Sequence, residues 1–103
     1  MARRPRAEET QVTSEPQENE DARHCASLNA YGSYLWGQHR WEEARAVFVK
    51  ASRIMPDDLA TRKNLAMASS ACGLDDEAIE IFADLAARFP DDAALHNSYG
   101  LVL

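Results

Sequence analysis

Histidine and cysteine, the residues that most often ligate metals or act as nucleophiles, are sparse in this chain. It contains three histidines and two cysteines. His24 and Cys25 are adjacent, so on a helix their side chains point about 100° apart and cannot share a task. His39 and Cys72 form the one plausible pair, because each is expected at a turn between helices. A structural zinc site usually takes four ligands, so turn polarity and a helix-end cysteine account for both residues.

Carboxylates recur in short runs that can in principle perform acid–base catalysis. The runs are Glu42-Glu43, Asp57-Asp58, Asp75-Asp76-Glu77 and Asp91-Asp92. All are expected at helix starts, where unsatisfied N–H groups and the helix dipole favour negative charge. The sequence also has no glycine-rich phosphate loop, no GxSxG and no HExxH motif. We therefore predict a protein that is not an enzyme and that needs no cofactor or metal.

Composition narrows the class of protein further. The 103 residues include 17 acidic and 11 basic side chains, for a net charge of -6. Nucleic-acid and anionic-membrane binding rest on clustered Lys and Arg, so neither partner is expected. No apolar run approaches the roughly 20 residues of a membrane helix, and no apolar segment follows the basic start at residues 1–6, as a secretory signal requires. With only two cysteines, these features predict a cytoplasmic protein.

The amino-terminal segment differs in composition from the rest of the chain. Residues 1–22 carry three arginines, six acidic residues and two prolines. Their only apolar residues are Met1, Ala2, Ala7, Val12 and Ala22. Such a segment cannot bury enough surface to offset the entropy lost on ordering. The sequence therefore predicts a disordered tail at residues 1–22 and a helical domain at residues 23–103.

The helical domain contains an internal repeat with one fixed offset. Ala44 recurs as Ala78, Phe48 as Phe82, and Pro56-Asp57-Asp58 as Pro90-Asp91-Asp92. The repeat defines two complete units, 25–58 and 59–92, and a partial unit, 93–103. Apolar spacings of three and four predict helices at 23–37, 41–55, 59–72 and 75–89, and Pro56 and Pro90 end the second helix of each unit.

Small residues recur where two helices of a unit are expected to cross. Gly32, Ala66 and Gly100 share one register, and Ala44 and Ala78 share another. Two helices approach closely only if one side chain at the crossing is small. Phe48 and Phe82, one turn after the alanines, are expected to fill the groove between neighbouring units.

This pattern resembles the tetratricopeptide repeat, a 34-residue helix–turn–helix unit. The residues that carry the resemblance are Leu28, Tyr31, Gly32, Leu35, Ala44, Phe48, Ala51 and Pro56, then Leu65, Ala66, Ala78, Phe82 and Pro90, and finally Tyr99, Gly100 and Leu103. The resemblance implies an all-α fold, a short α-solenoid of two complete units plus one additional helix. Arg62, His96, Leu85 and Ser69 depart from the pattern and are expected to weaken the packing of the later units.

The resemblance also implies a function. In that family the first helices line a concave groove that binds a peptide or helix of a partner protein. The matching positions here are Asn29, Ser33, Trp36, Lys63, Met67, Ser70, Asn97 and Leu101. The Lys and Arg clamp of chaperone-tail receptors is missing, since only Asn64 fits it. An alternative is a small cytoplasmic chaperone of a bacterial type III-like secretion system, which this chain resembles in size and architecture.

The carboxyl-terminal helix is expected to need a covering partner. It ends Tyr99-Gly100-Leu101-Val102-Leu103, which is apolar on nearly every side, and no second helix follows it in the chain. Exposed apolar ends of this kind mark interfaces or aggregation liabilities. We expect residues 95–103 to be covered by a second copy, as a homodimer, by a partner helix, or by residues beyond Leu103.

Overall fold

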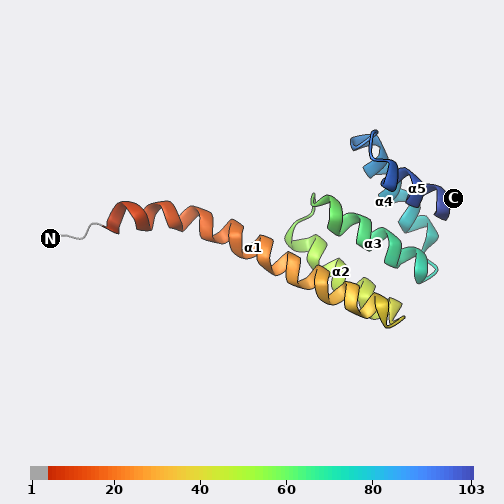
Figure 1. Ribbon diagram of the computed structural model, residues 1–103, viewed down its shortest axis with the longest axis horizontal. Coiled ribbons are helices and arrows are strands. Elements are labelled where there is room, and N and C mark those ends of the chain that lie inside the picture. Colours follow the sequence, from red (N-terminus) through yellow and green to blue (C-terminus); the bar gives the residue numbers. More distant parts are fainter. Residues whose placement is uncertain (1–4) are drawn as a thin grey trace.

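The chain folds into five α-helices. The computed structural model describes the backbone of residues 5–103 and the side chains of residues 19–103. The helices are α1 (Pro5–Gly37), α2 (Trp41–Ile54), α3 (Leu59–Ala71), α4 (Asp75–Arg88) and α5 (Ala93–Val102), as Figure 1 shows. No strand occurs between residues 5 and 103. The expected all-α fold is confirmed, and α2, α3 and α4 each end within one residue of the predicted boundary.

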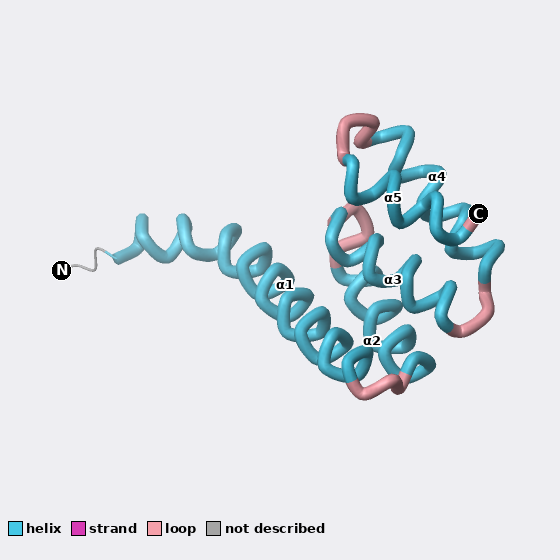
Figure 2. The backbone as a smooth tube through the Cα atoms, turned by 45° about the vertical axis from the view of Figure 1, so that its right-hand side comes forward, coloured by secondary structure: helices cyan, strands magenta, loops and turns pink. Residues whose placement is uncertain are grey.

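The helices stack in the order of the sequence. Each helix packs on the next, and the first helices of neighbouring units, α1 with α3 and α3 with α5, also touch. Figure 2 shows this arrangement, with short loops joining the helices. Contacts restricted to neighbours are typical of a solenoid built from repeated helix pairs.

The acidic residues before α3 and α5 cap these helices. The carboxylate of Asp58 accepts a hydrogen bond from the backbone N–H of Thr61 at 3.0 Å. Asp92 does the same for the N–H of Leu95 at 2.9 Å. Each cap satisfies a backbone donor that the helix leaves free. The interpretation of these acidic residues as structural is therefore confirmed at both positions.

The small residues lie at the helix crossings, as the repeat predicts. Ala44, Ala66 and Ala78 are fully buried. At Gly32, a built Cβ atom would lie 2.7 Å from Cζ of Phe48, so the phenyl ring occupies the place of a side chain. Phe48 and Phe82 are 2% and 0% exposed. The ring of Phe48 therefore fills the crossing within its own unit, whereas the sequence predicted it between neighbouring units.

The helix α1 begins before residue 23, where the helical domain is predicted to start. Residues 1–4 lie outside the described residues, but the backbone from Pro5 is helical and continuous with the first repeat helix. Proline is well suited to the first position of a helix, and the Glu, Gln and Ala that follow favour helix. In Figure 1 this part of α1 extends beyond α2. The division of the chain into a tail and a helical domain at residue 22 stays a prediction.

The expected weakness at Ser69 is also not what the structure shows. Ser69 is fully buried on α3, and its hydroxyl donates to Oε2 of Glu77 on α4. Arg45 of α2 binds the same carboxylate in a fork, with Nη2 2.8 Å from Oε1. A buried hydroxyl that makes a hydrogen bond avoids the desolvation penalty that an unpaired buried hydroxyl would carry. Ser69 therefore joins three helices instead of leaving a gap.

Candidate functional site

A hollow lies where the first helices of the three units meet. It has a volume of about 230 Å³. We call it the central hollow, and it is lined by Trp36, Met67, Ser70, Ala71, Phe82, Ser98, Leu101 and Val102. All but Phe82 come from α1, α3 and α5, so stacking of the repeats brings them together. None of these lining residues is charged.

Four of the residues predicted to face a groove line the central hollow. They are Trp36 of α1, Met67 and Ser70 of α3, and Leu101 of α5. Leu101 is 86% exposed and Met67 is 41% exposed, while Trp36 is half-buried. These side chains expose apolar surface to solvent inside a concavity. Binding sites are usually concave and apolar in this way.

The other four predicted groove residues do not line this hollow. The amide of Asn29 donates to Oγ1 of Thr61 at 2.8 Å and accepts from Asn64 at 3.2 Å, so it is engaged within the fold. The ammonium of Lys63 lies 3.7 Å from Oδ2 of Asp92, the residue that caps α5. Ser33 and Asn97 are exposed.

Sequence reasoning missed Ala71, Phe82, Ser98 and Val102 as lining residues. Phe82 was expected between neighbouring units, and its ring lies beside Tyr99 of α5, with centroids 6.3 Å apart. That expected place between the second and third units is the signal that could have identified Phe82 as a lining residue.

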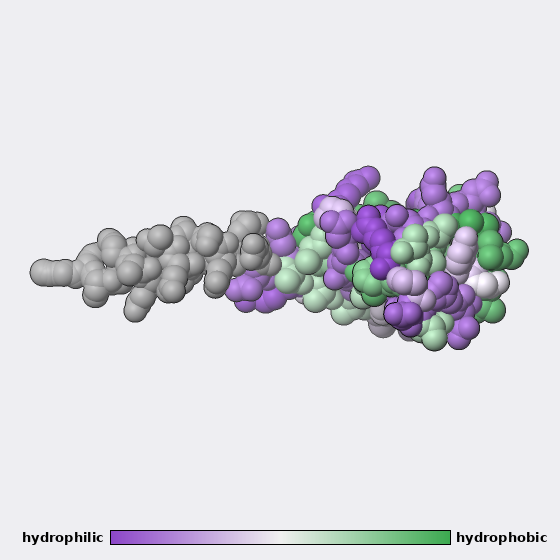
Figure 3. All heavy atoms as spheres, turned by 90° about the horizontal axis from the view of Figure 1, so that it is seen from above, coloured by the Kyte–Doolittle hydropathy of each residue, from purple (hydrophilic) through white to green (hydrophobic). Residues whose placement is uncertain are grey.

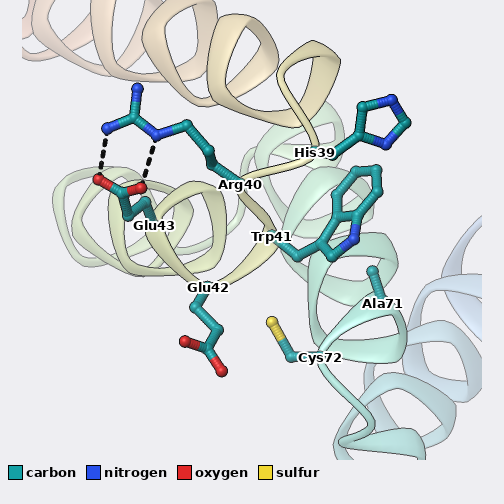
Figure 4. A pocket seen from close by; sticks show the side chains of 7 residues that line it. All are labelled: His39, Arg40, Trp41, Glu42, Glu43, Ala71 and Cys72. Carbon is teal, nitrogen blue, oxygen red and sulfur yellow. Dashed lines mark hydrogen bonds and ion pairs between the residues drawn. The ribbon is translucent and has the colours of Figure 1, made fainter.

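A second hollow lies at the edge formed by the loops within the units, and Figure 4 shows it closely. It has a volume of about 330 Å³, and we call it the turn hollow. It is lined by His39, Arg40, Trp41, Glu42, Glu43, Ala71 and Cys72. His39 and Cys72, which the sequence singled out as a plausible pair, therefore line the same hollow. His39 packs edge-on against Trp41, which packs in the same way against Trp36.

The electrostatics of the turn hollow do not support catalysis. Burial raises the pKa of the Cys72 thiol, and the carboxylate of Glu42 raises it further. Cys72 therefore stays protonated at neutral pH, although the thiolate is the nucleophilic form. Arg40 and Glu43 form a fork of hydrogen bonds at 2.6 and 2.7 Å, which lowers the pKa of Glu43. Among the residues from 19 onward, no group of three His, Cys, Asp or Glu side chains is placed to hold a metal ion.

The comparison with protein families agrees with the repeat geometry. The model of the tetratricopeptide repeat matches residues 35–100, which is more than half of the chain. The chain belongs to the tetratricopeptide repeat family. Comparisons with curated proteins and with solved structures found no significant match.

Tetratricopeptide repeats generally mediate protein–protein interaction, and the family is typically not enzymatic. The central hollow of this tetratricopeptide repeat domain has the concave, apolar character that such a role needs. In the described part of the chain, no helix combines the length and apolar character needed to cross a membrane.

Proposed function

We propose that this tetratricopeptide repeat domain binds a peptide or helix of a partner protein in the central hollow. The observation that carries the proposal is the meeting of Trp36, Met67 and Leu101, from three different helices, around one hollow. Trp is enriched among residues that dominate binding energy, and Met adapts its shape to irregular partners.

The lining of the hollow specifies the chemistry of the bound segment. Because none of the lining residues is charged, a buried charge on the partner would lose its hydration without gaining an ion pair. The nearby cation of Lys63 is already paired with Asp92. The hydroxyls of Ser70 and Ser98 offer hydrogen bonds to the partner's backbone. We therefore propose that a large apolar side chain of the partner enters the hollow.

A random peptide library displayed on phage tests this function. The expected selection is for peptides that share one large apolar anchor. Met67→Glu should weaken their binding at least about tenfold, because it places a charge at the entrance of an apolar site. Ala46→Glu adds the same charge at an exposed position of α2, away from the hollow, and should leave binding unchanged.

Circular dichroism of both variants checks that the fold is retained. Peptides that bind the wild type and Met67→Glu equally well would refute the central hollow as the binding site. The alternative of a type III-like secretion chaperone rests on size and architecture, and no contact among residues 19–103 favours it. The cytoplasmic location likewise stays a prediction.

A further inference from the structure

The turn hollow contains one carboxylate that is not neutralised by a neighbouring cation. Arg40 and Glu43, its other charged lining residues, neutralise each other through hydrogen bonds at 2.6 and 2.7 Å. The next cation on α2, Arg45, is engaged with Glu77 at 2.8 Å. Glu42 is exposed and makes no ion pair with any residue from 19 onward. Figure 4 shows its carboxylate turned away from the Arg40–Glu43 pair, so the hollow carries one uncompensated negative charge.

Aromatic rings form another part of the wall of the turn hollow. Trp41 lines the hollow and is half-buried, and the ring of His39 packs edge-on against it with centroids 5.0 Å apart. Trp36 holds the indole of Trp41 in place through a second edge-on contact at 4.6 Å. Among aromatic side chains, the indole of Trp attracts cations most strongly. The rings and the free carboxylate of Glu42 therefore favour the same kind of ligand group, a cation.

A guanidinium group matches this wall better than an ammonium group does. A guanidinium is planar and stacks on aromatic rings, it binds a carboxylate through two hydrogen bonds, and it is more weakly hydrated. Burial and the nearby Glu42 raise the pKa of the Cys72 thiol, so this thiol stays neutral and adds no charge to the hollow. The combination of Trp41 with Glu42 therefore favours arginine over lysine.

The turn hollow and the central hollow are neighbours. Ala71 lines both of them, and Trp36 of the central hollow touches Trp41 of the turn hollow. An extended chain advances about 3.3 Å per residue, so about four residues are enough to reach from one hollow into the other. The lining of the central hollow has no charge, whereas the turn hollow offers a free carboxylate. The two hollows therefore provide separate places for an apolar and a cationic side chain of one segment.

We propose that the turn hollow binds an arginine of the same partner segment whose apolar side chain enters the central hollow. The guanidinium lies against Trp41 and pairs with the carboxylate of Glu42, within about four residues of the apolar side chain. This inference rests on the proposed function, because it concerns a segment that is already seated in the central hollow. It adds a requirement for charge to the sequence of the partner.

The random peptide library displayed on phage tests this requirement, with the full-length protein and its Glu42→Lys variant as baits. The wild type should select peptides that share a large apolar residue and carry an arginine within about four residues of it. Glu42→Lys should select the apolar residue without the arginine, because the variant places a cation in the turn hollow. Circular dichroism checks that the variant keeps the fold.

A matched control separates the turn hollow from the general attraction of an acidic protein for cations. The chain has a net charge of -6, and Figure 3 shows hydrophilic side chains spread over much of the repeat domain. Glu80 is an exposed carboxylate that lines neither hollow. Glu80→Lys changes the net charge by the same amount as Glu42→Lys, but it should select the same peptides as the wild type.

Fluorescence polarisation with a synthetic peptide of the most enriched sequence measures the contact directly. Replacing its arginine with glutamine should weaken binding to the wild type about tenfold, through loss of the ion pair and of stacking on Trp41. The same replacement should weaken binding to Glu42→Gln only about threefold, because stacking remains. A difference of this kind between the two proteins reports a direct interaction between the arginine and Glu42.

Two kinds of failure are distinguishable. Peptides that lose affinity for Met67→Glu but carry no arginine would overturn this inference and leave the proposed function intact. So would an arginine whose replacement weakens binding to the wild type and to Glu42→Gln equally. Peptides that bind the wild type and Met67→Glu equally well would refute the central hollow as the binding site, and this inference with it.

Discussion

Single polar residues in this domain hold helices of different units together. The carboxylate of Glu77 receives hydrogen bonds from Ser69 of α3 and from Arg45 of α2, with Arg45 Nη2 2.8 Å from both oxygens. The Ser69 hydroxyl is the main cause of the lowered pKa of Glu77, and Arg45 adds to it. A charged acceptor with several donors makes stronger hydrogen bonds than a neutral one. This network therefore fixes how α4 sits on α2 and α3.

The network predicts a dependence of stability on pH. Because the folded state lowers the pKa of Glu77, its contribution is present above the ordinary glutamate pKa of about 4.5 and is lost as pH falls through the lowered value. Glu77→Gln should reduce stability at pH 7 by on the order of 1 kcal/mol. The difference from wild type should shrink as the pH is lowered below 4.5. Thermal melting from pH 7 to pH 3 measures both effects.

Glu80→Gln is the matched control, because Glu80 is an exposed carboxylate on the same helix. It should melt like the wild type at each pH. A difference between wild type and Glu77→Gln that stays constant down to pH 3 would show that the carboxylate charge does not stabilise the fold.

The sequence predicts which residues occupy turns, but not which polar residues pair. His39 and Gly73 hold the same register, and both adopt positive φ, 62° and 85°. Glycine at that position is readable from sequence, and histidine is among the residues that tolerate it. By contrast, Cys25 Sγ lies 3.2 Å from Thr61 Oγ1, which also accepts from Asn29. This pairing depends on how α1 crosses α3, which no local pattern specifies.

At the scale of the helices, the repeat period predicts most boundaries because each one has a local cause. Proline after α2 and after α4 excludes helix at the preceding residue, and Asp58 and Asp92 cap the helices that follow. The start of α1 is different. Its helical backbone from Pro5 agrees with the intrinsic helix propensity of a segment that has few apolar residues.

The two equivalent glycines should respond to substitution in opposite ways. Gly32→Ala places a methyl group against the buried ring of Phe48 and should destabilise the protein by about 1–3 kcal/mol. Gly100→Ala adds a methyl group in open space and improves helix propensity, so it should raise stability by up to about 1 kcal/mol. Urea unfolding followed by circular dichroism gives both values. Equal effects at the two positions would show that the crossing at Gly32 has room for a side chain.

At the scale of the whole molecule, the concave surface is partly predictable from sequence. The resemblance to the tetratricopeptide repeat placed Trp36, Met67, Ser70 and Leu101 on the groove side of the first helices, and the structure brings all four to the central hollow. It could not show that Asn29 and Lys63 are engaged with Thr61 and Asp92, because those contacts join different units. Local spacing defines the face of a helix, while the curvature of the stack decides which residues of that face converge.

Each helix contacts mainly its neighbours, so a deletion at one end of the molecule removes only the contacts of that end. Deletions at the two ends should therefore differ in their effect on stability. Deletion of residues 93–103 removes Leu95, which is 0% exposed, and Tyr99, whose ring packs beside Phe82. Loss of two such apolar side chains costs several kcal/mol, so the melting temperature should fall by more than about 10 °C. Deletion of residues 1–18 leaves Cys25 in place, which is the first buried residue among those from residue 19 onward. This segment has few apolar residues, and its loss should lower the melting temperature by less than about 3 °C. Circular dichroism melts of the two truncated proteins beside the full chain make the comparison. If the amino-terminal deletion proved the more damaging, residues 1–18 would contribute to the fold through contacts that their composition does not predict.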